Sequence, residues 1–381
     1  MSANDNIVRV RADILRIPTI RAHKLSMATM NEQRTVLVKI ETNQGVVGLG
    51  EAATIGGLAY SEESPDSIKL TIEKYFAPLL IGKNVKDYGA LISLIGSSAV
   101  GNFFAKMAIE TALLDIAGKK AGLPISDFLG GRIHDRLEVA WTLASGDTDT
   151  DIEEGEQVLS KHRHRHFKLK IGKRRWQEDV AHCAAIASAF TGRASIRVDV
   201  NQAWDLSTAK QALPALYEAG VEMAEQPIAA HDHEGMCLLA EQLPIAIVAD
   251  EAMRGGPPTA RAIVKARAGD GVSLKIAQAG GLAACKSVAE IALAAGFSLY
   301  GGTMLEGPIA TAASAHLFSV LPKAHWHTEL FGPLLLSQEV LATPLSYEEF
   351  SLLVPAGPGL GVDLNEDAVS EAISRENSAE N

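Results

Sequence analysis

The chain of 381 residues has little cysteine, no excess of positive charge and no long apolar run, and each shortage excludes a class of protein. Its three cysteines, Cys183, Cys237 and Cys285, are odd in number and lie in helix-like stretches, which predicts reduced core residues of a cytoplasmic protein. A net charge of −11 disfavours nucleic acid and anionic membrane surfaces as partners. Because no stretch of 18 apolar residues occurs and the start lacks a basic segment followed by an apolar run, we expect neither membrane insertion nor export.

What is present is an ordinary globular composition, 47% hydrophobic and 21% charged, in a chain longer than the roughly 250 residues of one compact barrel. From about residue 137, strand-like and helix-like stretches alternate regularly, and near Pro344 the alternation stops. We therefore expect an α+β capping domain over residues 1–133, a β/α barrel over residues 134–343, and a C-terminal segment, 344–381, that rejoins the capping domain.

The two ends of the chain show weaker local signals. The first part is typical of a mixed sheet followed by helices, with strands near 36–42 and 46–50 and a helix over 104–120. Near the other end, residues 350–364 predict a strand, a turn and a final strand, and the tail after Arg375 has a composition typical of disorder.

Charged residues recur through the middle of the chain at the period of a β/α unit. They are Lys168, Asp199, Glu225, Asp250 and Lys275, at gaps of 31, 26, 25 and 25 residues. Each follows a short apolar run, and one strand with one helix and two turns needs about 25 to 30 residues. The spacing therefore places one charged group at the mouth of each successive strand of a parallel barrel. Glu329, two unit lengths beyond Lys275, completes the ring at an eighth strand.

Three of these positions are carboxylates that converge from neighbouring strands. Asp199, Glu225 and Asp250 would repel one another unless a cation lay between them. Oxygen ligands at this density suit Mg²⁺ or Mn²⁺ better than zinc. Any one of them alone could equally cap a helix or face solvent, but three in register at strand ends favour a metal site.

The lysines suggest proton transfer on both sides of this site. Lys168 and Lys170 lie two apart, so a strand points both to one side and Leu169 to the other. Two neighbouring ammonium groups, one of them desolvated near a divalent cation, are expected to lower each other's pKa, which would make a lysine usable as acid and base. Lys275 faces them from the sixth strand. The alternative is that Lys-x-Lys is a solvated edge.

Together these residues resemble the enolase superfamily and, within it, the muconate cycloisomerases. The motifs that carry the resemblance are Lys168-x-Lys170, Asp199-x-Asn201, Glu225-Gln-Pro, Asp250-Glu251 and Lys275, with Thr54 to Tyr60, Trp141 to Gly146, Gly301 to Gly307 and Thr328 to Pro333. The resemblance implies a modified (β/α)7β barrel with an α+β capping domain, a Mn²⁺ or Mg²⁺ cofactor, a small dicarboxylate substrate and a homo-oligomer, commonly an octamer. It implies the reversible cycloisomerisation of cis,cis-muconate to muconolactone, in the catechol ortho-cleavage branch of aromatic catabolism.

The resemblance also assigns roles by position. It implies that Asp199, Glu225 and Asp250 hold the metal and that Lys170 is the acid and base, with Lys168 lowering its pKa. Lys275 faces the other side of the enolate, and Glu329 lines the pocket. Ile55 and Tyr60 belong to a flexible lid and, with Asn201, are expected to contact the substrate.

Other features have plainer interpretations. Residues 161–166, Lys-His-Arg-His-Arg-His, are expected to be a solvated basic helix end. Glu306 could line the pocket or form structural hydrogen bonds. Gly48-Leu-Gly50 is a weak match to a dinucleotide loop, because no helix follows it at once.

Two departures from the family pattern leave the substrate's substituents open. His327 stands where glycine is more usual, and Gln278-Ala279 stand where Lys-Asn is frequent. We expect both to border the pocket and neither to touch a metal ligand. Chloromuconate cycloisomerase, N-acylamino acid racemase, o-succinylbenzoate synthase and dipeptide epimerase stay as alternatives, although His327-Thr-Glu329 lacks the Asp-x-Asp expected for dipeptides. A binding protein without the chemistry would be expected to have lost a ligand or a lysine, and none is lost.

Overall fold

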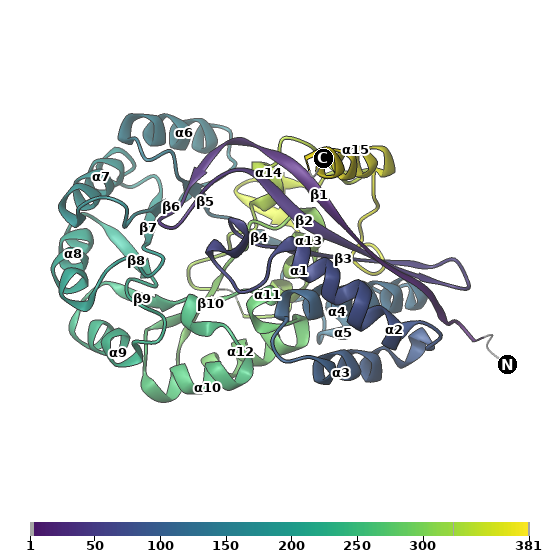
Figure 1. Ribbon diagram of the computed structural model, residues 1–381. Coiled ribbons are helices and arrows are strands. Elements are labelled where there is room, and N and C mark those ends of the chain that lie inside the picture. Colours follow the sequence, from purple (N-terminus) through teal and green to yellow (C-terminus); the bar gives the residue numbers. More distant parts are fainter. Residues whose placement is uncertain (1–3, 323, 380–381) are drawn as a thin grey trace.

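A computed structural model describes residues 4–322 and 324–379 and shows a long antiparallel sheet with helices lying beside a parallel barrel (Figure 1). The N-terminal sheet has the order β1-β2-β3. Its strands are β1 (Ile7–Lys24), β2 (Thr29–Thr42) and β3 (Val47–Ala53), and the helices after it are α1 (Pro65–Thr71), α2 (Ala77–Leu80), α3 (Tyr88–Ser98), α4 (Phe103–Ala121) and α5 (Ile125–Phe128). The expectation of a mixed sheet is wrong, since both pairings are antiparallel. Short connections turn the chain straight back, and only antiparallel neighbours can be joined that way.

The predicted long helix is confirmed as α4, and it packs directly on β3. A Cβ atom on Gly50 would lie 2.0 Å from the carbonyl oxygen of Ala108, and one on Gly48 would lie 2.2 Å from that of Ala112. Larger residues would therefore push the helix off the sheet. In this chain the Gly-x-Gly pair serves helix packing, not nucleotide binding.

The middle of the chain forms a seven-stranded parallel sheet in the order β11-β10-β9-β8-β7-β6-β5, with helices around its outside (Figure 1). The strands are β5 (Trp141–Leu143), β6 (His166–Lys170), β7 (Ser195–Asp199), β8 (Val221–Glu225), β9 (Ala246–Ala249), β10 (Gly271–Leu274) and β11 (Ser298–Gly301). The helices between them are α6 (Thr148–Ser160), α7 (Trp176–Ala189), α8 (Leu206–Glu218), α9 (His233–Gln242), α10 (Pro257–Ala266), α11 (Ile276–Ala279) and α12 (Leu282–Ala294), and α13 (Pro308–Ser319) follows β11.

An eighth extended segment closes this sheet into a barrel. Thr328 forms parallel bridges both to Gly301 at the end of β11 and to Val139 just before β5. The Ala140 N–H donates to the Thr328 carbonyl at 2.7 Å, and the Glu329 N–H donates to the Gly301 carbonyl at 2.7 Å. The fold class predicted from the sequence, a (β/α)7β barrel with an α+β cap, is confirmed.

The C-terminal part differs from its prediction. It contains α14 (Gly332–Leu335), β12 (Tyr347–Glu348), β13 (Ser351–Leu353) and α15 (Glu366–Ala379). β13 pairs with β4 (Arg136–Glu138) near the barrel, and residues 358–364 form no named strand. Residues 376–379 of the tail expected to be disordered belong to α15, and residues 380 and 381 lie outside the described residues. That helix buries Ala368, Val369 and Ala372 and packs against β1, so apolar residues at helical spacing outweigh the polar composition of the tail. The domain limits at residues 133 and 343 stay a prediction.

Two buried glutamates join the N-terminal part to the barrel helices. Glu51 of β3 accepts the backbone N–H groups of Ile309 and Ala310 at 3.1 and 2.9 Å, at the start of α13. Glu110 of α4 accepts that of Ala283 at 3.1 Å, at the start of α12. A carboxylate satisfies the unpaired donors and the positive dipole of a helix N-terminus. Burial raises the pKa of each glutamate to about 7.

The three cysteines are free thiols. Cys183 in α7 and Cys285 in α12 are buried, as predicted, whereas Cys237 in α9 is only partly buried. No disulfide links the three described cysteines.

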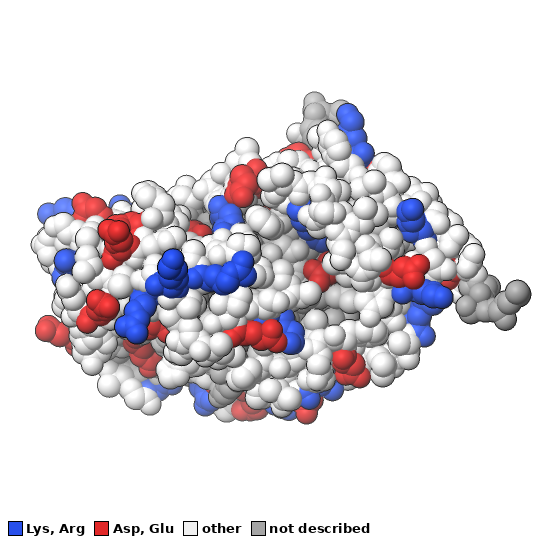
Figure 2. Space-filling model, turned by 90° about the horizontal axis from the view of Figure 1, so that it is seen from below, with Lys and Arg blue, Asp and Glu red and all other residues white. Residues whose placement is uncertain are grey.

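The surface carries charges of both signs. On the face shown in Figure 2, Lys and Arg side chains are interspersed with Asp and Glu over a mostly uncharged surface. Within residues 4–322 and 324–379, no helix has the length and apolar content needed to cross a bilayer.

Candidate active site

The charged residues that recur along the sequence lie together at one end of the barrel. Lys168 and Lys170 are on β6, Asp199 and Glu225 are the last residues of β7 and β8, and Asp250 directly follows β9. The strand register pairs Lys170 with Asp199 and Asp199 with Glu225, so these side chains leave adjacent strands at one level. Lys275 directly follows β10, and Glu329 lies on the eighth segment. Parallel strands thus gather residues that are far apart in sequence.

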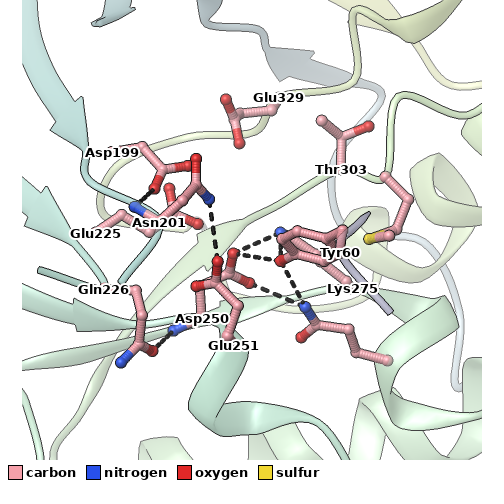
Figure 3. A network of polar contacts seen from close by, with 12 residues as sticks. Tyr60, Asp199, Asn201, Glu225, Gln226, Asp250, Glu251, Lys275, Thr303 and Glu329 are labelled. Carbon is pink, nitrogen blue, oxygen red and sulfur yellow. Dashed lines mark hydrogen bonds and ion pairs between the residues drawn. The ribbon is translucent and has the colours of Figure 1, made fainter. Parts of the chain in front are cut away.

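Asp199, Glu225 and Asp250 are fully buried, and each offers an oxygen within 4.8 Å of the others. Figure 3 shows their carboxylates converging between β7, β8 and the end of β9. Among the described residues, Glu225 Oε1 has no hydrogen-bond partner. A set of three hard oxygen donors, one of them unsatisfied, fits a divalent cation such as Mg²⁺ or Mn²⁺.

Each of these carboxylates is also paired with a lysine. Lys168 Nζ lies 2.8 Å from Glu225 and 2.5 Å from Glu329, and Lys170 Nζ lies 2.5 Å from Asp199. Lys275 Nζ lies 2.6 Å from an oxygen of Asp250. The predicted arrangement of lysines on two sides of the carboxylates is therefore present in the structure.

The expectation that neighbouring ammonium groups beside a divalent cation lower each other's pKa stays a prediction. Burial alone would lower the pKa of Lys168, but Glu225 and Glu329 outweigh it and raise the pKa well above its usual value. Burial likewise opposes, and Asp250 and Glu225 favour, a raised pKa for Lys275. The contact with carboxylates, not the presence of a second lysine, dominates both groups.

The pKa values of the carboxyl groups shift in different directions, because the site holds more carboxyl groups than lysines. Burial and the neighbouring carboxylates of Asp199 and Asp250 raise the pKa of Glu225 to about 8, although Lys168 opposes this. Burial, Asp250 and Asp199 raise the pKa of Glu251 to about 8 as well. In Asp199 the attraction of Lys170 and Lys168 overcomes burial and lowers the pKa. A divalent cation would balance the negative charge that remains in this network.

The loop after β3 brings Tyr60 into contact with this network. The Tyr60 hydroxyl donates to Asp250 at 2.8 Å and accepts from Lys275 and Gln278 at 3.0 Å each (Figure 3). Ile55, from the same loop, lines a cavity beside this network together with Lys168, Lys170 and Lys275. The free volume of this cavity is about 10 Å³. The lid role expected for residues 54–60 stays a prediction.

The side chain of Asn201 links Lys170 to Glu251. Its Oδ1 accepts from Lys170 at 3.3 Å and its Nδ2 donates to Glu251 at 3.1 Å. Its φ of 45° lies in the left-handed region that asparagine tolerates better than most residues. This backbone turn directs the side chain back over the strand end.

Sequence reasoning misjudged one residue of the site, Gln278, and gave no role to Glu251 and His23. Gln278 donates to Asp250 Oδ1 at 3.2 Å, so the expectation that it touches no candidate ligand is wrong. The only signal was its departure from the family pattern. Glu251 directly follows Asp250 in the sequence, but nothing local showed that it is buried. His23 of β1 lines the cavity and had no sequence signal, because strand pairing alone brings it there.

The expectation for residues 161–166 is wrong in part, and so is the one for His327. His164 is buried, and His166 belongs to β6, where its ring stacks on His327 with centroids 4.0 Å apart. Glu138 contacts both rings but also pairs with Arg165 at 2.8 Å. These residues precede the strand ends, so the cluster lies at the other end of the barrel from the site. Because the carboxylate is already neutralised by a guanidinium, we interpret the cluster as structural.

Glu306 is also structural. It accepts from the Thr303 hydroxyl and, at 2.9 Å, from the Met304 N–H, and it does not line the cavity. It therefore holds the loop after β11 in shape.

Comparisons with known proteins agree with this architecture. The profile of the mandelate racemase / muconate lactonizing enzyme N-terminal domain matches residues 9–130, and that of the enolase C-terminal domain-like family matches residues 151–368. A muconate cycloisomerase of Acinetobacter lwoffii is 52% identical over 95% of this chain and 94% of its own length. A chloromuconate cycloisomerase of Cupriavidus necator is 40% identical over 95% and 98%.

A solved structure extends the likeness to three dimensions. The muconate lactonizing enzyme of Pseudomonas fluorescens, complexed with muconolactone, has a TM-score of 0.95 and 48% identity and covers 97% of this chain and 99% of its own. The chain belongs to the muconate cycloisomerase family of the enolase superfamily.

Proposed function

We propose that the protein catalyses the reversible, divalent-metal-dependent cycloisomerisation of cis,cis-muconate to muconolactone, within the ortho-cleavage branch of aromatic catabolism. The observation that carries this proposal is the ring of three buried carboxylates with Lys170 on one side and Lys275 on the other. The higher identity to a muconate cycloisomerase than to a chloromuconate cycloisomerase supports the unsubstituted compound as the substrate.

The proposed reaction forms one C–O bond and one C–H bond. A carboxylate oxygen at one end of muconate adds to a carbon of the double bond conjugated with the other carboxylate. The electron pair of that double bond moves onto the second carboxylate, which gives an enolate. Lys170 then donates a proton to the carbon beside it, and the reverse reaction returns the proton to Lys170. No other reactant is required.

We assign the remaining residues around this reaction. Asp199, Glu225 and Asp250 would hold Mg²⁺ or Mn²⁺, and the bound ion supplies positive charge beside the substrate carboxylate. Lys168 and Lys275 contribute further positive charge, which stabilises the enolate electrostatically. The role of Glu329 is to fix Lys168 through their 2.5 Å contact.

The substrate would be enclosed by groups from three segments. Ile55 and Tyr60 cover it from the loop after β3, and Asn201 contacts it from the β7 side. Closure of this loop excludes water from a reactive enolate. We further propose a cytoplasmic homo-oligomer, an octamer by family resemblance, which size-exclusion chromatography with light scattering would test.

The test follows muconate absorbance with added Mn²⁺ or Mg²⁺. Wild type should convert muconate, and Lys170→Ala should lose about 10²- to 10⁴-fold in kcat, the usual contribution of a general acid. Lys173→Ala, at an exposed lysine three residues away, should match wild type. Full activity in Lys170→Ala would refute the assigned acid, and an inactive wild type with both metals would refute the function.

Metal binding can be tested apart from turnover. Mn²⁺ should raise the melting temperature of the wild-type protein, because a ligand bound only by the folded state stabilises it. Asp250→Asn should lose most of this shift. An equal shift in both proteins would place the ion elsewhere.

A further inference from the structure

His23 is a fully buried residue of β1 that lines the active-site cavity together with Lys168 and Lys170. The pairing of β1 with β2 is irregular between Pro18 and His23, and regular register resumes at His23 opposite Met30. This local break in the strand carries His23 over the barrel mouth. His23 takes no part in the reaction proposed above.

The tautomer of His23 follows from its neighbour Arg21. A guanidinium nitrogen of Arg21 lies 3.4 Å from His23 Nδ1. Arginine has donors only, so Nδ1 must be the acceptor in this contact, and the ring proton of the neutral imidazole is then on Nε2. Burial and the charges of Arg21, Lys170 and Lys168 lower the pKa of His23 well below its usual value, which keeps the ring neutral.

Arg21 is itself held by the barrel. Its Nε donates to Glu154 of α6 at 2.8 Å, and its Nη2 donates to the Thr142 carbonyl of β5 at 2.7 Å. Trp141 donates to the same oxygen of Glu154 at 2.7 Å. The guanidinium group of Arg21, which sets the His23 tautomer, is therefore held in place by Glu154 and Thr142. Little freedom remains for the imidazole to move its ring proton.

The Nε2–H group of His23 has no hydrogen-bond partner among residues 4–322 and 324–379. Burial removes the water that would otherwise satisfy such a donor, so buried polar groups without a partner are rare. His23 lines the same cavity as Lys168 and Lys170, the one proposed to take a dianion. A carboxylate oxygen is the acceptor that would satisfy it, and its charge would strengthen the bond.

We propose that His23 is a substrate-binding residue that donates its Nε2–H to the substrate carboxylate on the Lys168–Lys170 side of the cavity, and that Arg21 is the positioning residue that fixes its tautomer. This inference rests on the function proposed above. It gives the N-terminal sheet a direct part in recognising a carboxylate of the substrate.

The test uses steady-state kinetics with cis,cis-muconate and Mn²⁺ in the full-length protein. His23→Met keeps the bulk and removes the donor, so KM should rise about 10- to 100-fold, the usual weight of a charge-assisted hydrogen bond, with kcat changed much less. His23→Gln keeps an N–H donor near the position of Nε2, and its KM should return to within about fivefold of wild type. An unchanged KM in His23→Met, or a KM in His23→Gln no lower than in His23→Met, would overturn the proposal.

A double-mutant cycle tests the role of Arg21. Arg21→Met should raise KM severalfold in the wild-type background, because the imidazole can then move its proton to Nδ1. In the His23→Gln background it should add little, since an amide has no second tautomer. Equal effects in both backgrounds would overturn the positioning role. Arg16→Met, which removes a partly exposed arginine of the same strand, is the control and should leave KM unchanged.

The cycle does not depend on the folding of His23→Met, and near-UV circular dichroism monitors all variants. A wild-type protein that does not convert muconate would refute the proposed function. If the wild type converts muconate but the variants have the same KM as the wild type, only this inference is refuted.

Discussion

Glu110→Gln should change how the stability of the protein depends on pH. Glu110 is buried in α4 and accepts the N–H of Ala283 at the start of α12, the helix that follows Lys275 and Gln278 in the chain. Burial raises its pKa from 4.5 to about 7, although backbone hydrogen bonds oppose the shift. Glutamine has a similar shape and keeps one oxygen acceptor, but it cannot ionise.

The sign and size of the effect follow from proton linkage. Below about pH 4.5 the carboxyl group is protonated in both states and contributes no pH dependence. Between about pH 4.5 and 7 the folded chain holds a proton that the unfolded chain has lost, so stability falls as the pH rises. The whole loss is about 3 kcal/mol, since one pKa unit corresponds to about 1.4 kcal/mol. Glu110→Gln lacks this loss.

Urea unfolding of both proteins at a fixed protein concentration would measure the difference. From about pH 5 to about pH 8, the unfolding free energy of Glu110→Gln relative to wild type should rise by about 2 to 3 kcal/mol. Any constant offset from the new amide cancels in this comparison. Glu290→Gln, at an exposed site on α12, should show no such rise. Parallel pH profiles for Glu110→Gln and wild type would show that the buried carboxyl group is not the titrating group.

Three further changes test the site and its support. Gly302→Ala should lower kcat about 10-fold or more, because its Cβ would lie 2.7 Å from Lys275 Cε and displace the ammonium group. Gly89→Ala, at an exposed position of α3, should be neutral or stabilising. Equal kcat values for Gly302→Ala and wild type would contradict this. Tyr60→Phe removes a hydroxyl with three partners, so KM for muconate should rise about 10-fold, and an unchanged KM in the absorbance assay would separate the loop from binding. Deleting residues 366–379 should lower the melting temperature by uncovering β1, and an unchanged thermal scan would mean that α15 adds no stability.

Spacing along the sequence predicted the candidate ring because each β/α unit repeats the same local geometry. Asp199 and Glu225 end short apolar strands and Asp250 directly follows one, and parallel strands of similar length bring their ends to one level. The pairing of Lys168 and Lys170 on one side follows from the two-residue period of a strand. These features depend on local periodicity, which a single sequence contains.

The tertiary structure decided whatever depends on contacts between distant segments. His23, Gln278 and Glu251 belong to the site because β1, α11 and the end of β9 meet there, and nothing local shows that His23 and Glu251 take part. The raised pKa of Lys168 depends on Glu225 and Glu329, which come from other strands. Likewise, α15 forms in a polar tail because β1 offers an apolar surface. Spacing is local and is readable in one sequence, whereas burial and charge environment are sums over neighbours that only the folded chain brings together.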